Sequence, residues 1–85
     1  MTNQTTPATH IDETVKTIIK NKSGNFAALP AYSDHLEKDL NLDSLDRIEI
    51  AMEIEAEFGI EVPDDMVEQW KTVSDVIRDA CDFIA

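Results

Sequence analysis

Apolar residues recur at helical spacing near the start of the chain, after a polar stretch at residues 1–8. They form one stripe along a predicted helix, at Ile11, Val15, Ile18 and Ile19. Thr9 or Asp12 is available to cap the start of this helix, and Ser23-Gly24-Asn25 is typical of its end. Because residues 1–8 lack large apolar side chains, we expect them to be a disordered tail and residues 9–85 to form the folded domain.

The segment that follows, up to Asp43, sustains no period and contains Pro30. Its apolar residues are scattered among polar ones, at Phe26, Leu29, Tyr32, Leu36 and Leu40. Structureless connections of this length are uncommon in compact domains. We therefore expect these apolar residues to hold the connection on the core, with a short helical turn near Leu36.

The clearest helix runs from Ser44 to about Phe58, with Asp43 suited to be its N-cap and Gly59 its stop. An extended stretch at residues 60–63 then leads to a short third helix. Its start is marked by Pro63 and its apolar contacts come from Met66, Val67 and Trp70.

A fourth helix is predicted after Thr72, which together with Asp75 resembles a capping box. Its apolar residues keep a helical period, at Val73, Val76, Ile77, Ala80, Phe83 and Ile84. The pattern as a whole predicts an all-α domain, a small four-helix bundle with a long first loop and a short third helix.

The second helix carries two apolar stripes on roughly opposite sides. One stripe suits a core face, with Ile50, Ala51, Ile54 and Phe58. The other consists of Leu45, Ile48 and Met52 and is flanked by Glu49 and Glu55. Because such charges are seldom buried unpaired, we expect this second stripe to lie at the surface and to form a docking site for a partner. The alternative is that the long first loop covers it.

Charge narrows the class of partner. The formal net charge is −11, and residues 34–68 hold 13 of the 18 acidic residues but only 2 of the 7 basic ones. Nucleic acid and anionic membranes are therefore unfavourable partners, whereas basic protein surfaces are favoured. No apolar run is long enough to span a membrane, so we expect a cytoplasmic protein without membrane insertion, and a monomer.

The sequence offers little evidence of a catalytic site or of a metal site. Cys81 is the only cysteine, and neither His10 nor His35 has an evident nucleophilic partner. Residues 39–43 begin like a calcium-binding loop, with Asp39, Asn41 and Asp43, but the required glycine and the final glutamate are out of place. We therefore predict no catalytic residue and no metal site.

The run Asp39-Leu40-Asn41-Leu42-Asp43-Ser44-Leu45-Asp46 resembles the attachment motif of the acyl carrier proteins. The spacing of the helices, the Phe58-Gly59 stop and the Pro63-Asp64 step are similar to that family over nearly the whole chain. The resemblance implies a non-enzymatic carrier whose Ser44, next to Asp43, bears a covalent 4′-phosphopantetheine arm. Acyl intermediates would then be held as thioesters in fatty-acid, lipid or polyketide-type biosynthesis.

The resemblance also implies which proteins dock. These are a phosphopantetheinyl transferase, which is the holo-carrier synthase, and acyl synthases, transferases and ketosynthases with basic docking surfaces. The matching recognition positions are Leu45, Asp46, Ile48, Glu49, Met52 and Glu55.

Three positions depart from the family pattern: Asn41 stands where glycine is usual, Arg47 adds a positive charge to an acidic helix, and Trp70 replaces a smaller aliphatic residue. Asparagine tolerates left-handed backbone, so the turn at Asn41 is expected to persist. The alternatives are an aminoacyl or peptidyl carrier, and an acidic adaptor protein that is never modified. Modification of Ser44 separates the adaptor from the carriers.

Overall fold

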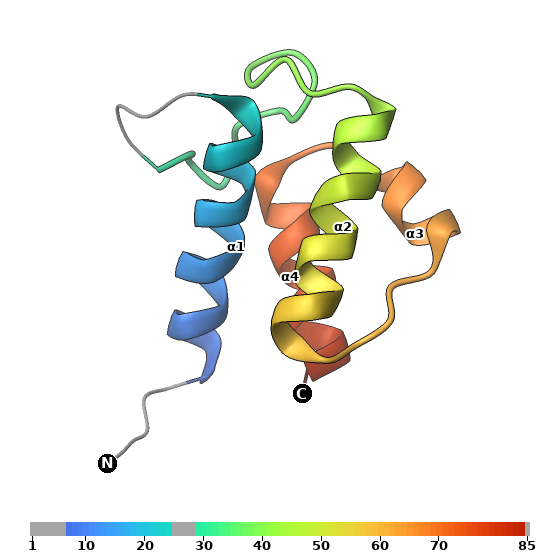
Figure 1. The fold of residues 1–85 in the computed structure, drawn as a ribbon. Helices are drawn as coiled ribbons and strands as arrows, with labels where there is room; N and C mark the ends of the chain where they lie inside the picture. Colours follow the sequence, from blue (N-terminus) through green and yellow to red (C-terminus); the bar gives the residue numbers. More distant parts are fainter. Residues whose placement is uncertain (1–6, 25–28, 85) are drawn as a thin grey trace.

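The computed structural model describes residues 7–24 and 29–84 and contains four helices in that part of the chain. They are α1 (Pro7–Ser23), α2 (Ser44–Phe58), α3 (Asp64–Gln69) and α4 (Val73–Ile84). α1 packs against α4 and α2, and α2 also packs against the short α3 (Figure 1). The predicted all-α bundle is confirmed, including the long first loop and the short third helix.

One apolar core joins the four helices. It takes in the predicted stripes of α1, α2 and α4 apart from Phe83, which is 38% exposed, and Ile50 and Ile54 of α2 are fully buried. The long connection adds Leu36, and the α3 segment adds Val67 and Trp70. The core face of α2 is therefore the one that the sequence predicts.

The start of α1 differs from the prediction. The helix begins at Pro7, so Thr9 and Asp12 lie inside it and not at its start. Proline is well suited to a first helical position. Its fixed φ matches the helix, and an N–H group at this position would have no acceptor within the helix. The predicted end is confirmed: α1 stops at Ser23, and Gly24 has a φ of +76°. Residues 1–6 and Phe26 lie outside the described residues.

The long connection is held largely by backbone hydrogen bonds to the start of α4. The N–H of Leu36 donates to the Lys71 carbonyl at 2.8 Å, and the N–H of Val73 donates to the Asp34 carbonyl at 3.0 Å. Leu36 is fully buried and Leu40 packs against the core, as expected, but Leu29 and Tyr32 are nearly half exposed. The prediction that Leu29 and Tyr32 hold the connection by burial is therefore wrong.

Candidate functional site at the start of α2

The first turn of α2 is fixed by two reciprocal hydrogen bonds. Asp43 is the N-cap, and its carboxylate accepts from the N–H of Asp46 at 2.9 Å. The carboxylate of Asp46 in turn accepts from the N–H of Asp43 at 3.1 Å. This capping box places Ser44 at the first position of the helix, and it confirms the predicted N-cap.

The chain enters this helix through a turn that needs left-handed backbone. Asn41 has a φ of +59°, and among the described residues it is the one non-glycine residue with a positive φ. Its N–H donates to the Glu37 carbonyl at 3.0 Å, and Leu42 after it is buried. The expectation that asparagine preserves the turn is therefore confirmed. Asparagine adopts left-handed backbone at lower cost than most other residues.

His35 stabilises the same turn in a way that the sequence did not indicate. Its Nδ1 accepts hydrogen bonds from the N–H groups of Glu37 and Lys38, each at 3.2 Å. Its own N–H donates to the Asp39 carboxylate at 2.7 Å. His35 therefore acts as a structural acceptor in the loop before Ser44.

Ser44 is exposed, and the backbone around it suits an anion. Of the first four N–H groups of α2, those of Asp46 and Arg47 bond to Asp43. Those of Ser44 and Leu45 have no acceptor among the described residues. Free N–H groups and the positive end of the helix dipole favour a phosphate at this point. The surroundings of Ser44 therefore fit a phosphodiester on its hydroxyl.

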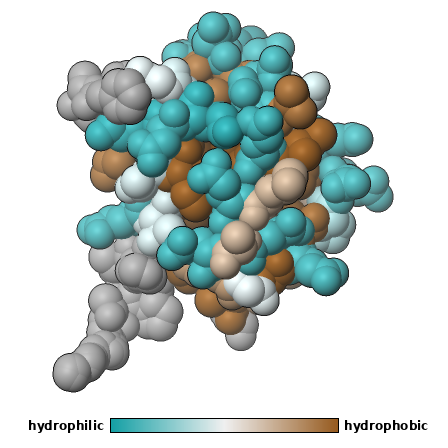
Figure 2. All heavy atoms as spheres, viewed as in Figure 1, coloured by the Kyte–Doolittle hydropathy of each residue, from teal (hydrophilic) through white to brown (hydrophobic). Residues whose placement is uncertain are grey.

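An apolar strip runs along α2 from this point. Leu45 is 60% exposed, Ile48 is 44% exposed and Met52 is 60% exposed. In Figure 2 hydrophobic atoms reach the surface over α2 among hydrophilic ones. The long loop does not cover the strip, so the prediction that it lies at the surface is confirmed. We call Leu45, Ile48 and Met52 the apolar strip.

On the α1 side of this strip, the acidic residues are paired with a cation of the chain itself. The ammonium group of Lys22, near the end of α1, lies 2.7 Å from a carboxylate oxygen of Glu49 and 3.7 Å from one of Glu53. The hydrogen bond to Glu49 is the main cause that raises the pKa of Lys22, with smaller contributions from Glu53 and Asp46. The sequence prediction missed Lys22, because only the packing of α1 on α2 brings it to these carboxylates.

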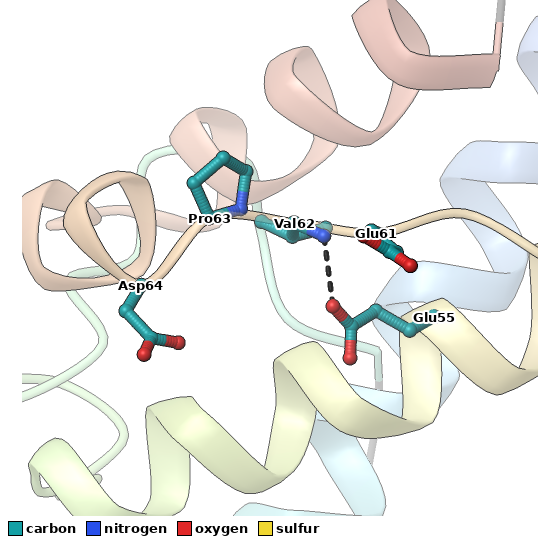
Figure 3. Close-up of a pocket in the computed structure, with 5 residues that line it drawn as sticks. All are labelled: Glu55, Glu61, Val62, Pro63 and Asp64. Atoms are coloured by element: carbon teal, nitrogen blue, oxygen red, sulfur yellow. Dashed lines mark hydrogen bonds between the residues drawn. The ribbon is translucent and has the colours of Figure 1, made fainter.

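On the α3 side, Glu55 is tied to the backbone. Its carboxylate accepts from the N–H of Val62 at 2.8 Å, so it holds the extended segment that leads to α3 (Figure 3). A hollow beside it is lined by Glu55, Glu61, Val62, Pro63 and Asp64. Glu49 and Glu55 both flank the apolar strip, and each also has a structural contact within the chain.

Arg47 lies on the other side of α2 from the apolar strip. Helical spacing places it in the arc of the core-facing Ile50 and Ile54. Its side chain is half-buried, and its Nε is buried without a hydrogen-bond partner. The positive charge that stood out in the sequence is therefore next to the core and not on the strip.

The remaining departures and candidates have structural roles. Trp70 is buried, and its indole N–H donates to the Asp79 carboxylate of α4 at 2.8 Å. Cys81 packs against the core, and burial is the main cause that raises the pKa of its thiol. Within residues 7–24 and 29–84, no group of three or more His, Cys, Asp or Glu side chains is placed to hold a metal ion. No helix in that part of the chain is long and apolar enough to cross a membrane.

Comparison with known proteins identifies the family. Residues 13–79 match the family model of the phosphopantetheine attachment site. The chain is 40% identical to an acyl carrier protein of Rickettsia typhi over 68 residues, which cover 80% of this chain and 79% of the relative. It is 53% identical to an acyl carrier protein of Thermosynechococcus vestitus over 47 residues, which cover 55% of this chain and 53% of the relative.

The fold has a close counterpart among solved structures. The crystal structure of an acyl carrier protein from Thermotoga maritima superposes with a TM-score of 0.78. The match covers 96% of this chain and 95% of that one at 21% sequence identity, so it supports the fold.

The chain belongs to the acyl carrier proteins, the family defined by a phosphopantetheine attachment site. It is therefore a non-catalytic acyl carrier, and its prosthetic group is a covalently attached 4′-phosphopantetheine. The resemblance, the carrier function and the cofactor expected from the sequence are confirmed.

Proposed function

We propose that Ser44 is the residue that receives the 4′-phosphopantetheine arm and that the apolar strip of α2 is where the transferase and the acyl enzymes dock. The observation that carries the proposal is the exposed Ser44 at a capped helix start, from which the exposed apolar strip runs along α2. Among the described residues Ser44 is the one serine at the first position of a helix: Ser23 ends α1, Ser33 lies in the long connection and Ser74 is the second residue of α4.

The residues around Ser44 have separate roles in this function. Attachment replaces the Oγ–H bond of Ser44 by an Oγ–P bond to phosphopantetheine. The pyrophosphate P–O bond of coenzyme A breaks in this step, and adenosine 3′,5′-bisphosphate and the hydroxyl proton are released. Asp43 and Asp46 fix the first turn, so the hydroxyl is presented in one place. The arm supplies a terminal thiol that holds acyl groups as thioesters, while this chain provides the anchor and the docking surface.

The partner that fits the docking surface has an apolar contact ringed by Lys and Arg. The apolar strip lies on a helix with five acidic residues, of which Asp46, Glu49 and Glu55 are the predicted recognition positions. Opposite charge accelerates the encounter, and burial of the strip holds the complex together. The phosphopantetheinyl transferase and the acyl synthases, transferases and ketosynthases of fatty-acid, lipid or polyketide-type biosynthesis are the proposed partners. The cytoplasm remains the predicted compartment, from the sequence alone.

Peptide mapping tests the attachment site. Trypsin cleaves after Lys38 and Arg47 and releases residues 39–47, in which Ser44 is the one side chain with a hydroxyl. After incubation with coenzyme A and a transferase, the mass of one phosphopantetheinyl group should appear on this peptide, or on a longer peptide that contains it. A gain on a peptide that carries Ser33 or Ser74 instead would contradict the proposal.

Introducing a charge on the strip tests the docking surface. Met52→Glu places a charge on the apolar contact, and we expect kcat/KM for modification of Ser44 to fall at least about tenfold, as for an interface residue that contributes strongly to binding. Phe83→Glu is the matched control, because Phe83 is a 38% exposed apolar residue on α4. An equal effect of both variants, or of neither, would show that the strip is not the docking site.

A further inference from the structure

Arg47 has no acidic partner among the described residues, although the chain has 18 acidic residues and only 7 Lys and Arg. The ion pairs in that part of the molecule are made by Lys22 and Arg78. The Nε of Arg47 is buried with no hydrogen-bond partner, which is costly and uncommon in folded proteins. An unpaired guanidinium in so acidic a chain suggests that its partner is a group outside the polypeptide.

The position of Arg47 on the helix brings it next to Ser44. It follows Ser44 by three residues within α2, and side chains at this spacing are neighbours with Cβ atoms about 5–6 Å apart. Side chains on a helix also lean toward its N-terminus, which here means toward Ser44. The two terminal nitrogens of Arg47 make no hydrogen bond or ion pair within the described residues and are not among their buried unpaired atoms, so they are in part accessible to solvent.

A cation at this place would stabilise a phosphodiester on Ser44 further. The phosphodiester would stand next to the carboxylates of Asp43 and Asp46, and both repel it. The free N–H groups of Ser44 and Leu45 supply only partial positive charge. Arg47 is the one full cation in the first turn of α2, and a guanidinium is well matched to phosphate oxygens.

We propose that Arg47 is the phosphate-binding residue of this carrier and pairs with the phosphodiester once it is attached to Ser44. The inference rests on the proposed attachment at Ser44. Because Arg47 lies away from Leu45 and Met52 around the helix, this pairing draws the root of the arm to the core side of α2. The apolar strip then stays uncovered for a partner protein while the arm is present.

The test compares the apo and holo forms of the wild type, of Arg47→Gln and of Lys71→Gln. Lys71 is exposed and outside the helices, so its variant is matched in charge but removes a cation elsewhere. NMR of the Arg47 Nε–H group and of phosphorus provides the first readout. In the wild type the Nε–H resonance should move when the arm is attached, and the phosphorus shift should differ from that of holo Arg47→Gln but match that of holo Lys71→Gln.

Thermal unfolding provides the second readout. The holo form of the wild type and of Lys71→Gln should gain several degrees in Tm over the apo form, and Arg47→Gln should lose most of this gain. An unchanged Nε–H resonance in the wild type, or the same gain in all three proteins, would overturn the assignment. The wild-type NMR experiment decides the question even if Arg47→Gln does not fold. Intact mass separates the two proposals, because attachment without these shifts contradicts only the role of Arg47, whereas no attachment contradicts both.

Discussion

The hydrogen bond between Trp70 and Asp79 makes a measurable prediction about the stability of the carrier. It joins the end of α3 to α4 inside the core, where Trp70 is 3% exposed and Asp79 is 8% exposed. Trp70→Phe removes the indole N–H donor, so a buried carboxylate oxygen of Asp79 loses its hydrogen bond. The remaining contact of that carboxylate is a 3.3 Å hydrogen bond from Arg78 to its other oxygen.

The size of the effect follows from two terms. An unsatisfied buried polar group costs about 1–3 kcal/mol, and the smaller ring leaves unfilled volume that costs about 1 kcal/mol more. The free energy of unfolding should therefore fall by about 2–4 kcal/mol, which lowers the Tm of a domain of this size by at least about 8 °C. Asp79→Asn keeps an oxygen that accepts from the indole and should cost less.

Chemical denaturation of Trp70→Phe, of Asp79→Leu and of the double variant tests this reasoning. Asp79→Leu combined with Trp70→Phe removes both polar partners, so the double variant should be less destabilised than the sum of Trp70→Phe and Asp79→Leu. A loss below about 1 kcal/mol for Trp70→Phe, or strict additivity in the double variant, would show that this hydrogen bond does not stabilise the core as described.

Three further predictions concern the docking helix, the start of α4 and the turn before Ser44. Lys22→Met frees Glu49 and Glu53 for a basic partner, so at low salt it should raise kcat/KM for modification by roughly two- to fivefold; Lys71→Met should have a smaller effect, and equal effects would indicate net charge alone. Burial alone would raise the pKa of Asp75, but hydrogen bonds from the N–H groups of Lys71 and Thr72 and the charge of Arg78 lower it below 3.8. Its stabilisation is therefore present above about pH 4 and is lost as the pH falls through the folded pKa, so urea denaturation should show a gap between the wild type and Asp75→Asn that is larger at pH 6 than at pH 3, and a constant gap would refute the pairing. Asn41→Val forces a β-branched residue to the φ of +59° and should lower the unfolding free energy by about 1–2 kcal/mol in the same assay, whereas Asn41→Gly should not; similar losses in both would contradict the left-handed turn.

The sequence predicted α2 well because several local signals agree there. Asp43 as a cap, Gly59 as a stop and the core stripe of Ile50 and Ile54 all depend on residues close together in the chain. The same holds for the exposed apolar strip, whose position follows from helical spacing and from the flanking Glu49 and Glu55. Local signals of this kind also identified the capping box of α4, where Thr72 and Asp75 bond reciprocally.

The features that the sequence did not predict depend on contacts between distant residues. Leu29 and Tyr32 are nearly half exposed, and the long connection is held by backbone bonds such as Val73 to Asp34, which no side-chain pattern indicates. Tyr32 contacts α1 instead, where its hydroxyl donates to the Asp12 carboxylate and the Lys16 ammonium lies over its ring. The pairing of Lys22 with Glu49 joins residues 27 positions apart. These contacts exist only after the helices have packed, so periodicity and capping rules cannot reveal them.

The central claim is that Ser44 anchors the arm of this acyl carrier protein. The most direct test is the intact mass of the wild type and of Ser44→Ala after incubation with coenzyme A and a broad-specificity phosphopantetheinyl transferase, with circular dichroism to show that both are folded. The account predicts a gain of one phosphopantetheinyl group in the wild type and none in the variant. An equal gain in Ser44→Ala, or no gain in a folded wild type with several transferases, would contradict it.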